Sequence, residues 1–312
     1  MNDLKTAVLL IGFGGPTSMA EVRPFLQSVL EGVEIPQSRL DEVTRHYEIF
    51  QGASPYNEIT KRQKESLEFW LKVRGASLPV YIGLRHALPS FQGVFEAMKH
   101  DGVQRVLGFV LSSFRCYASF EKYIKKLEEG RSAARAESII VDYMENFYDQ
   151  PLFLEAQISK IRSAVSDLSI ENLTKTFFLF SAHSVPVPMS SESGYARQFE
   201  KASRQIVQDL KLAHWDIAYQ SRSGNPRDPW LEPDVRGFIA SLDPSRFRRV
   251  VLVPIGFLCD NVEVLYDLDI EAREAVEKKG LIYLRASTVT DHPKFIEMIG
   301  GQILQKIEYS AA

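Results

Sequence analysis

The stretch Arg248-Arg-Val-Val-Leu-Val-Pro-Ile-Gly-Phe257 is a run of β-branched and aliphatic residues that ends in a turn containing Pro and Gly. Such a run is typical of a strand buried on both faces of a sheet. Gly102-Val-Gln-Arg-Val-Leu-Gly-Phe-Val-Leu111 has a similar pattern in the first half of the chain. A helix-length segment separates each stretch from an earlier apolar run, Val80–Arg85 in the first half and Asp216–Ser221 in the second. We interpret the halves as two copies of one α/β unit.

Short apolar runs alternate with longer amphipathic stretches along the whole chain. We expect strands at Ala7–Ile11, Val80–Ile82, Arg105–Leu111, Ser138–Val141, Thr176–Phe180, Asp216–Tyr219, Val250–Pro254 and Leu281–Tyr283. We expect helices at Met19–Leu30, Gln63–Val73, Phe91–Lys99, Phe120–Glu129, Pro151–Val165, Tyr195–Leu210, Pro233–Ala240, Val262–Lys278 and His292–Ile307. This alternation predicts an α/β fold with parallel sheets flanked by helices, in two domains at 1–149 and 150–312. The last helix is a candidate to pack back on the first domain.

The composition is that of an ordinary globular protein. Of the 312 residues, 45% are hydrophobic and 25% are charged, which excludes a largely disordered, collagen-like or coiled-coil chain. The 37 Lys and Arg residues nearly balance the 40 Asp and Glu residues, so the formal net charge is −3. This balance argues against nucleic-acid binding through bulk charge.

Neither a membrane span nor a secretion signal is visible in the sequence. No window approaches the roughly 20 apolar residues that a transmembrane helix needs, and the N-terminus lacks the pattern of a signal peptide. We therefore expect a cytoplasmic protein. Cys116 and Cys259 are the only cysteines, too few for a disulfide framework, a thiolate zinc site or an iron–sulfur cluster.

The glycine-rich stretch Gly12-Phe-Gly-Gly-Pro16 follows the first expected strand. A dinucleotide-binding turn needs a third glycine at position 17, which is Thr17 here, and Pro16 removes a backbone N–H from the start of the next helix. The sequence therefore favours a tight turn that lets a flat ligand approach the backbone. A purely structural turn is the alternative.

The segment Ser181-Ala-His-Ser-Val-Pro186 begins where the strand Thr176–Phe180 is expected to end. Loops at the carboxyl ends of parallel strands are where α/β folds assemble their ligand sites. His183 is therefore a candidate functional residue, although a lone histidine is more often a packed or solvated side chain.

The segment Asp260-Asn-Val-Glu-Val-Leu-Tyr-Asp-Leu-Asp-Ile-Glu271 contains acidic residues at a regular spacing of four. On a helix, Glu263, Asp267 and Glu271 stand four residues apart and line one face. Like charges stacked in this way repel each other, so the row is either a solvated outer face or a path for cations.

The segment Gln220–Asp234 is rich in turn-forming residues and contains Trp230. It is too irregular for a helix or strand and too patterned for a disordered linker. A structural belt and the wall of a ligand site are equally consistent with it.

Together these segments resemble the ferrochelatases, which insert ferrous iron into a porphyrin during haem synthesis. The resemblance lies in Gly12–Pro16, Gly52–Pro55 with Asn57 and Thr60, Tyr81–Arg85, Ser181–Pro186, Trp215–Asp234 and Val253–Glu271. These segments span most of the chain in the family's order. The resemblance implies two Rossmann-like domains around a porphyrin site and the activity of a metal chelatase, a lyase.

The resemblance also implies roles for individual residues. His183 and Glu263 match the family's paired catalytic and metal-binding residues, and Asp267 and Glu271 match an acidic row that leads from them. The expected porphyrin contacts are Phe13, Gly14, His46, Tyr47, Ser54, Tyr123, Ser184 and Trp230.

The chain departs from the family pattern at four positions. Phe13 stands where relatives that act on coproporphyrin often have a tyrosine, and it has no oxygen to offer a metal. Leu30 and His46 stand where arginines hold porphyrin propionates in some of those relatives. Asn261 replaces a histidine and cannot relay a proton.

The expected reaction is insertion of Fe²⁺ into protoporphyrin IX or coproporphyrin III with release of two protons. We expect a monomer with no tightly bound cofactor, and peripheral contact with a membrane stays open. The short segment between residues 15 and 52 is similar to that of the soluble bacterial members. Two alternatives remain: a porphyrin or haem carrier without turnover, and a chelatase that loads cobalt or nickel into another tetrapyrrole.

Overall fold

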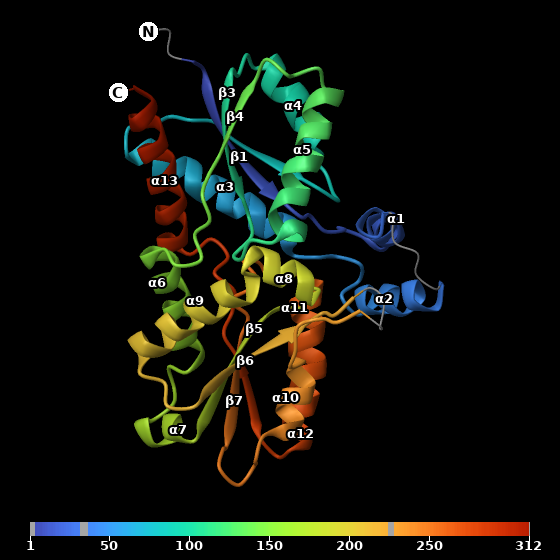
Figure 1. Cartoon of the computed structure of the whole chain (residues 1–312), viewed down its shortest axis with the longest axis vertical. Helices are drawn as coiled ribbons and strands as arrows, with labels where there is room; N and C mark the ends of the chain where they lie inside the picture. The colour runs from blue at the N-terminus through green and yellow to red at the C-terminus, as the bar shows by residue number, and fades with distance from the viewer. Residues whose placement is uncertain (1–3, 32–36, 224–227, 312) are drawn as a thin grey trace. The chain divides into compact units, whose positions relative to one another are not determined.

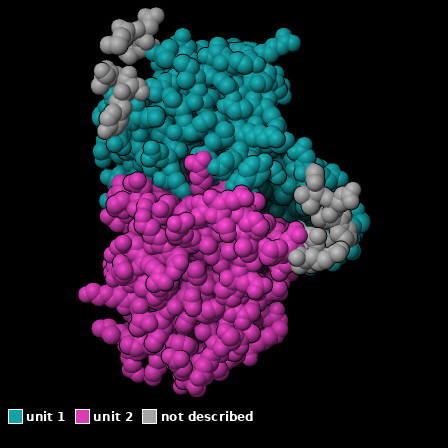
Figure 2. Space-filling view, viewed as in Figure 1, with its two compact units in different colours: residues 1–112, 117–146, 291–312 teal, residues 113–116, 147–290 magenta. Residues whose placement is uncertain are grey.

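The computed structural model describes residues 4–31, 37–223 and 228–311. By its internal contacts the chain divides into two compact units, which Figure 2 shows in different colours. Unit 1 comprises Met1–Ser112, Tyr117–Asn146 and Asp291–Ala312, and unit 2 comprises Ser113–Cys116 and Phe147–Thr290. The C-terminal helix is thus part of unit 1, and the short segment Ser113–Cys116 is part of unit 2.

Unit 1 is built on a four-stranded parallel sheet with the order β2-β1-β3-β4. Its strands are β1 (Thr6–Gly12), β2 (Val80–Leu84), β3 (Arg105–Val110) and β4 (Ile140–Tyr143). Its helices are α1 (Met19–Val29), α2 (Gln37–Ile49), α3 (Tyr56–Val73), α4 (Phe91–His100), the π-helical segment η1 (Tyr117–Glu121), α5 (Lys122–Ala133) and α13 (Pro293–Ala311). Helices α4 and α5 lie on one side of this sheet and α3 and α13 on the other (Figure 1).

Unit 2 repeats this plan with a parallel sheet of order β6-β5-β7-β8. Its strands are β5 (Thr176–His183), β6 (Trp215–Gln220), β7 (Arg249–Val253) and β8 (Ile282–Arg285). Its helices are α6 (Pro151–Ala164), α7 (Ile170–Thr174), α8 (Val187–Ser193), α9 (Tyr195–Leu210), α10 (Val235–Ser241), α11 (Val262–Tyr266), the π-helical segment η2 (Asp267–Ala272) and α12 (Arg273–Lys278).

The two sheets have the same connectivity. In each unit the first strand lies between the second and the third, and the fourth strand pairs with the third. Residues Ala7–Ile11 of β1 are fully buried, as are most residues of β5, because helices cover both faces of each sheet. The α/β fold with duplicated parallel sheets, predicted from the alternating pattern, is confirmed.

The expected strands all form, with ends that differ by up to three residues. The largest difference is at β5, which continues from Phe180 to His183 through the fully buried Ser181. Ser181 can extend a buried strand because its hydroxyl donates to Gln220 Oε1 of β6, at 2.9 Å. His183 is therefore the last residue of β5 and does not lie in the following loop.

Three helices were not expected: α2, α7 and α8. Helix α2 is dominated by polar residues, and α7 and α8 have only 5 and 7 residues, too few to show a helical period. No helix in the described part of the chain is long and apolar enough to cross a membrane.

Candidate metal-binding and catalytic site

His183 ends strand β5 in unit 2, in register with Gln220 at the end of β6. Its Nδ1 lies 2.5 Å from the carbonyl oxygen of Ser184. A carbonyl oxygen can only accept a hydrogen bond, so Nδ1 carries the proton and the lone pair of the neutral ring is on Nε2. The side chain is 32% exposed, which leaves this basic nitrogen accessible.

Glu263 faces that nitrogen from helix α11. Its Oε1 lies 3.9 Å from His183 Nε2, beyond hydrogen-bond distance. Nitrogen and oxygen ligands lie about 2.0–2.2 Å from a divalent ion such as Zn²⁺, so one ion could contact both atoms. The structure thus brings together the two residues predicted to act as a pair.

A glycine allows the chain after β7 to pass close to β5. A Cβ at Gly256 would lie 2.6 Å from the Cα and Cβ atoms of Ala182, the residue before His183. The Gly256 N–H donates to the carbonyl oxygen of Ser181 at 3.1 Å. This close approach leads the chain toward α11, on which Glu263 stands.

Helices α11, η2 and α12 run on without interruption from Val262 to Lys278. Their buried face consists of residues four apart, Val264, Leu268, Ala272 and Val276, which pack in one core cluster with β5 and β7. In a regular α-helix, residues four apart turn about 40° from one another at each step. The wider turn of η2 offsets that rotation and keeps both this face and the acidic row aligned. The π-helical segment was not predicted from the sequence.

Asp267 is the second carboxyl of the row and occupies the least favourable environment for a charge. The pKa of Asp267 is raised to about 7, mainly by burial. A hydrogen bond from Ser221 and the nearby His183 oppose the rise, and the charges of Glu263 and Glu271 contribute to it. Ser221 Oγ donates to Asp267 Oδ2 by a short hydrogen bond, and Gln220 Nε2 lies 3.4 Å from the same oxygen. A carboxyl with this pKa can accept and release a proton near neutral pH.

Glu271, the third carboxyl, is paired with a cation from another element. Arg236 Nη1 of α10 lies 3.0 Å from Glu271 Oε1. The sequence showed no basic residue interleaved in the row before Arg273. The tertiary structure supplies one from 35 residues away.

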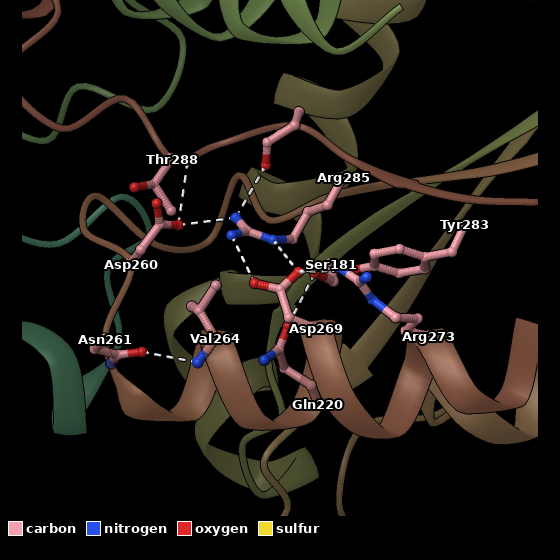
Figure 3. Close-up of polar contacts among 11 residues, drawn as sticks. Ser181, Gln220, Asp260, Asn261, Val264, Asp269, Arg273, Tyr283, Arg285 and Thr288 are labelled. Atoms are coloured by element: carbon pink, nitrogen blue, oxygen red, sulfur yellow. Dashed lines mark hydrogen bonds and ion pairs between the residues drawn. The ribbon is translucent and has the colours of Figure 1, made fainter. Parts of the chain in front are cut away.

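A half-buried arginine holds the helix that carries the row (Figure 3). Arg285 of β8 donates to both oxygens of Asp269 in η2, from Nε and Nη2, each at 2.8 Å. Its Nη1 also donates to Asp260 Oδ1 at 2.9 Å. One guanidinium thus fixes the loop before α11 and the π-helical segment after it. Nothing in the sequence pattern singled out Arg285, Asp260 or Asp269 for this function.

Asn261, one of the four departures from the family pattern, has a clear local function. Its Oδ1 accepts from the backbone N–H of Val264 at 2.9 Å, which caps the N-terminus of α11 (Figure 3). The amide therefore stabilises the first turn of the helix on which Glu263 stands.

The segment around Trp230 is tied to the strand end that carries His183. Pro186 and Trp230 form an antiparallel bridge, and the Leu231 N–H donates to the carbonyl oxygen of Val185 at 3.0 Å. Ser184 is 2% exposed and its hydroxyl donates to the carbonyl oxygen of Leu231 at 2.9 Å. Ser184 thus ties the loop together, and Trp230 lies beside the site with a buried Nε1 that has no hydrogen-bond partner within the described residues. Part of the Gln220–Asp234 segment, residues 224–227, lies outside the described residues.

The expected porphyrin contacts near the N-terminus lie in unit 1. The Phe13 ring packs against His86, with centroids 4.7 Å apart, against Phe25 at 6.0 Å and against Tyr123 at 6.5 Å. Tyr47 packs against Phe25 at 6.0 Å. These rings form an aromatic cluster that supports the Gly12–Pro16 turn. His86, which the sequence reasoning missed, is central to it.

Gly14 and Ser54 shape the same turn. Gly14 has φ +88°, and a Cβ at Gly15 would lie 2.6 Å from Ser54 Cβ, so this backbone approaches its neighbours too closely for larger residues. Ser54 is 8% exposed. His46 lies in the last turn of α2 and is half-buried.

No group of three or more His, Cys, Asp or Glu side chains within the described residues could hold a metal ion as a cage. The His183–Glu263 pair therefore offers two ligands from the protein. Two ligands suit an ion that must be released, because resident structural metals usually have four protein ligands.

The chain is similar to known proteins over nearly its whole length. The family model for Ferrochelatase matches residues 5–307. The chain is 36% identical over 300 residues to the Ferrochelatase of Rhodopirellula baltica, a match that covers 96% of this chain and 85% of the relative. It is 35% identical over 296 residues to the Coproporphyrin III ferrochelatase of Mycolicibacterium smegmatis, covering 94% and 87%.

Solved structures show the same fold at low sequence identity. SirB from Bacillus subtilis with Fe³⁺ matches with a TM-score of 0.61 and 12% identity over 97% of this chain and 95% of that one. The Deinococcus radiodurans protein DR2241, which has structural similarity to chelatases, matches with a TM-score of 0.55 and 14% identity, covering 95% of this chain and 54% of that one. From the family model and these relatives, the chain belongs to the ferrochelatase family, which is a family of metal chelatases of the lyase class.

Proposed function

We propose that this protein inserts Fe²⁺ into a porphyrin in haem synthesis, with His183 and Glu263 as the metal-binding and catalytic pair. The observation that carries the proposal is the geometry of that pair. His183 Nδ1 is occupied by a backbone carbonyl, and the free Nε2 faces Glu263 Oε1 across 3.9 Å.

Metal insertion requires an exchangeable grip on the ion and acceptors for two pyrrole protons. A neutral imidazole binds several divalent ions and can also accept a proton. The Glu263 carboxylate can balance the charge of the ion from the other side. Because the pKa of Asp267 is raised to about 7, that carboxyl can take a proton from the pair and pass it outward toward Glu271.

The substrate proposed is a free porphyrin, either coproporphyrin III or protoporphyrin IX. Several relatives of this chain are named coproporphyrin III ferrochelatases. In this chain Leu30 and His46 remove two expected partners for porphyrin carboxylates, which favours the less charged protoporphyrin IX. We therefore propose that both porphyrins are substrates.

We also propose that the enzyme is a monomer without a resident cofactor. Fe²⁺ is then a substrate and not a bound cofactor. Cys116 and Cys259 are 1% and 3% exposed and cannot supply the four thiolates of a typical iron–sulfur cluster.

Anaerobic turnover with Fe²⁺ and each porphyrin, followed by the Soret and visible bands, tests the function. We expect His183→Ala to lower turnover by at least 10²-fold, the usual effect of losing a general base, with porphyrin binding within a few-fold of wild type. His100→Ala is the matched control, because His100 is an exposed imidazole at the end of α4.

Two outcomes would contradict the proposal. Porphyrin binding without metal insertion by the wild type would identify a carrier. Turnover by His183→Ala above about a tenth of wild type would exclude His183 as the essential base, given the size of the effect expected for that role.

A further inference from the structure

Basic side chains gather in unit 1 beside the aromatic cluster that includes Phe13. Arg85 follows β2, and Lys122 and Lys126 stand one turn apart at the start of α5. The electrostatic effects of Arg85, Lys122 and Lys126 all reach His86, the ring that packs against Phe13. This corner of unit 1 therefore concentrates positive charge.

Within this group, the charge of Lys126 is balanced by two carboxylates. Its Nζ lies 3.0 Å from Glu31 Oε2 and 3.1 Å from Glu129 Oε2. These contacts raise the pKa of Lys126, led by the hydrogen bond to Glu31.

Arg85 forms no ion pair with a carboxylate among the described residues, although the charge of Glu31 acts on it from a distance. Its Cζ lies 5.4 Å from the ring centroid of Tyr123, and its buried Nε has no hydrogen-bond partner within the described residues. Burial is the main cause that lowers its pKa. A desolvated donor without an acceptor is unfavourable, and an arriving anion would relieve that state.

Lys122 contrasts with Lys126 on the same helix. It is half-buried, and no carboxylate in residues 4–31, 37–223 or 228–311 forms an ion pair or hydrogen bond with it. Burial is the main cause that lowers the pKa of Lys122; the neighbouring Arg85 and Lys126 lower it too, and Glu31 opposes them. Three cations therefore act on one another at this place in unit 1.

The position of Lys122 relates it to a departure from the family pattern. Leu30 directly precedes Glu31, and Glu31 is bound by Lys126, one helical turn after Lys122. The end of α1, where an arginine is expected in relatives, therefore lies beside the start of α5. A cation on α5 can take over the charge that Leu30 cannot supply.

We propose that Lys122 is a specificity-determining residue that binds a carboxylate of the porphyrin, with Arg85 beside it. This inference rests on the proposed porphyrin substrate. Lys122 would supply the positive charge that Leu30 lacks at the position where some relatives have an arginine. If Lys122 had only a structural function, its side chain would stabilise the fold. A half-buried lysine that forms no ion pair within the described residues and serves to bind a ligand does not stabilise the fold.

The test compares Lys122→Met with Lys125→Met. Lys125 is an exposed lysine on the same helix, so both variants lose the same charge from α5. The probes are metal-free coproporphyrin III and metal-free protoporphyrin IX, and binding is measured by quenching of tryptophan fluorescence. Loss of one charge-assisted hydrogen bond should weaken binding by about tenfold or more in Lys122→Met. Lys125→Met should bind within about twofold of wild type, because exposed charges contribute little.

Three further measurements separate recognition from folding. Lys122→Arg should restore binding to within about threefold, since it keeps the charge. Lys122→Met should bind with a weaker dependence on salt and raise the KM for porphyrin more than it lowers kcat, as expected for an interaction made equally in the bound and transition states. Its Tm should equal or exceed that of the wild type.

The outcomes distinguish this inference from the function on which it rests. Unchanged porphyrin binding in Lys122→Met, or equal weakening in Lys125→Met, would overturn the inference while wild-type turnover still supports the proposed function. Porphyrin binding that depends on Lys122, without metal insertion by the wild type, would keep the inference and overturn the function. A wild-type protein that binds neither porphyrin would overturn both.

Discussion

The proton on Nδ1 of His183 decides what this side chain can do. Because the Ser184 carbonyl holds that proton, the basic Nε2 is directed at Glu263 and not into the protein backbone. The residue types alone show that an imidazole and a carboxylate are present. The choice of tautomer depends on a backbone oxygen of the very next residue.

Asp267 gives the protein a predicted dependence of stability on pH. Its pKa is raised from 3.8 to about 7 in the folded state, so folding favours the protonated form. The contribution to stability is fully present below about pH 4 and is lost as the pH rises through about 7. Asp267→Asn should therefore be more stable than the wild type at pH 9, by about 1–4 kcal/mol.

Denaturant unfolding of both proteins between pH 5 and 9 checks this prediction. Asp209→Asn, a change at an exposed carboxyl of α9, should leave the wild-type pH profile unaltered. A parallel pH profile for Asp267→Asn and the wild type would show that Asp267 titrates at an ordinary pH.

The three carboxylates of the row should differ in their effects on activity. Glu263→Gln should be nearly inactive, because an amide can neither accept a proton nor balance the metal charge. Changes at Asp267 and Glu271 should raise the KM for Fe²⁺ more than they lower kcat, if the row delivers the ion. Steady-state kinetics with varied Fe²⁺ measures this split, and equal losses at all three positions would instead indicate a helix with only a structural function.

At the scale of elements, the site depends on how one helix is held. Helix α11 and its π-helical continuation are fixed on one side by apolar residues packed on β5 and β7. They are fixed on the other by Arg285, which joins Asp260 and Asp269. An arginine with two carboxylate partners is stable when partly buried because its charge is more than matched. The carboxylate row can therefore keep its spacing despite mutual repulsion.

Helix α13 offers a test of packing within unit 1. A Cβ at Gly300 would lie 2.3 Å from two carbons of the Trp70 ring on α3, whereas a Cβ at Gly301 would meet no atom within 4 Å. We predict that Gly300→Ala lowers the free energy of unfolding by about 1–3 kcal/mol through overpacking. Gly301→Ala should raise it by about 0.5–1 kcal/mol, because alanine favours the helix.

Urea unfolding of the two variants measures both effects under the same conditions. The pair differs by one position on one helix, so a general effect of alanine on α13 would move both midpoints in the same direction. That result would show that α13 does not pack on α3 at Gly300.

For the whole molecule, the residues favour opposite preferences between the two porphyrins. The short segment between residues 15 and 52 favours the more carboxylated coproporphyrin III, while Leu30 and His46 favour protoporphyrin IX. One charge-assisted hydrogen bond is worth roughly 1.5–3 kcal/mol, so each lost partner changes binding by about tenfold or more. With these effects in opposition, we expect turnover of both porphyrins with a preference below about a hundredfold.

Competition assays with both porphyrins at several ionic strengths measure this preference. A preference above about a hundredfold in either direction would mean that other residues hold the carboxylates. Arg23 on the surface of unit 1 is already paired with Asp41, at 2.8 Å.

The duplicated α/β plan could be predicted from the sequence pattern alone, and the resemblance to the ferrochelatases named His183 and Glu263 as a candidate pair. Buried parallel strands need long apolar runs, and these runs are visible in β1, β3, β5 and β7 without any tertiary information. His183 lies at the carboxyl end of one such strand and Glu263 follows another, which is why their position near the strand ends could be inferred before their geometry. Polar α2 and the very short α7 and α8 escaped prediction because a helix held by tertiary contacts does not need a strong period of its own.

The environment of the site residues could not be predicted from the sequence, because the contacts that set it join residues far apart in the chain. Arg236 reaches Glu271 across 35 residues, and Ser221 reaches Asp267 across 46. The raised pKa of Asp267 results from burial, which no local pattern encodes. The π-helical turn likewise arises where packing on the sheet and the Arg285–Asp269 contact override the ordinary helical period. Local sequence specifies strands and helices through periodicity, whereas charge, burial and alignment in the site depend on which distant side chains the fold brings together.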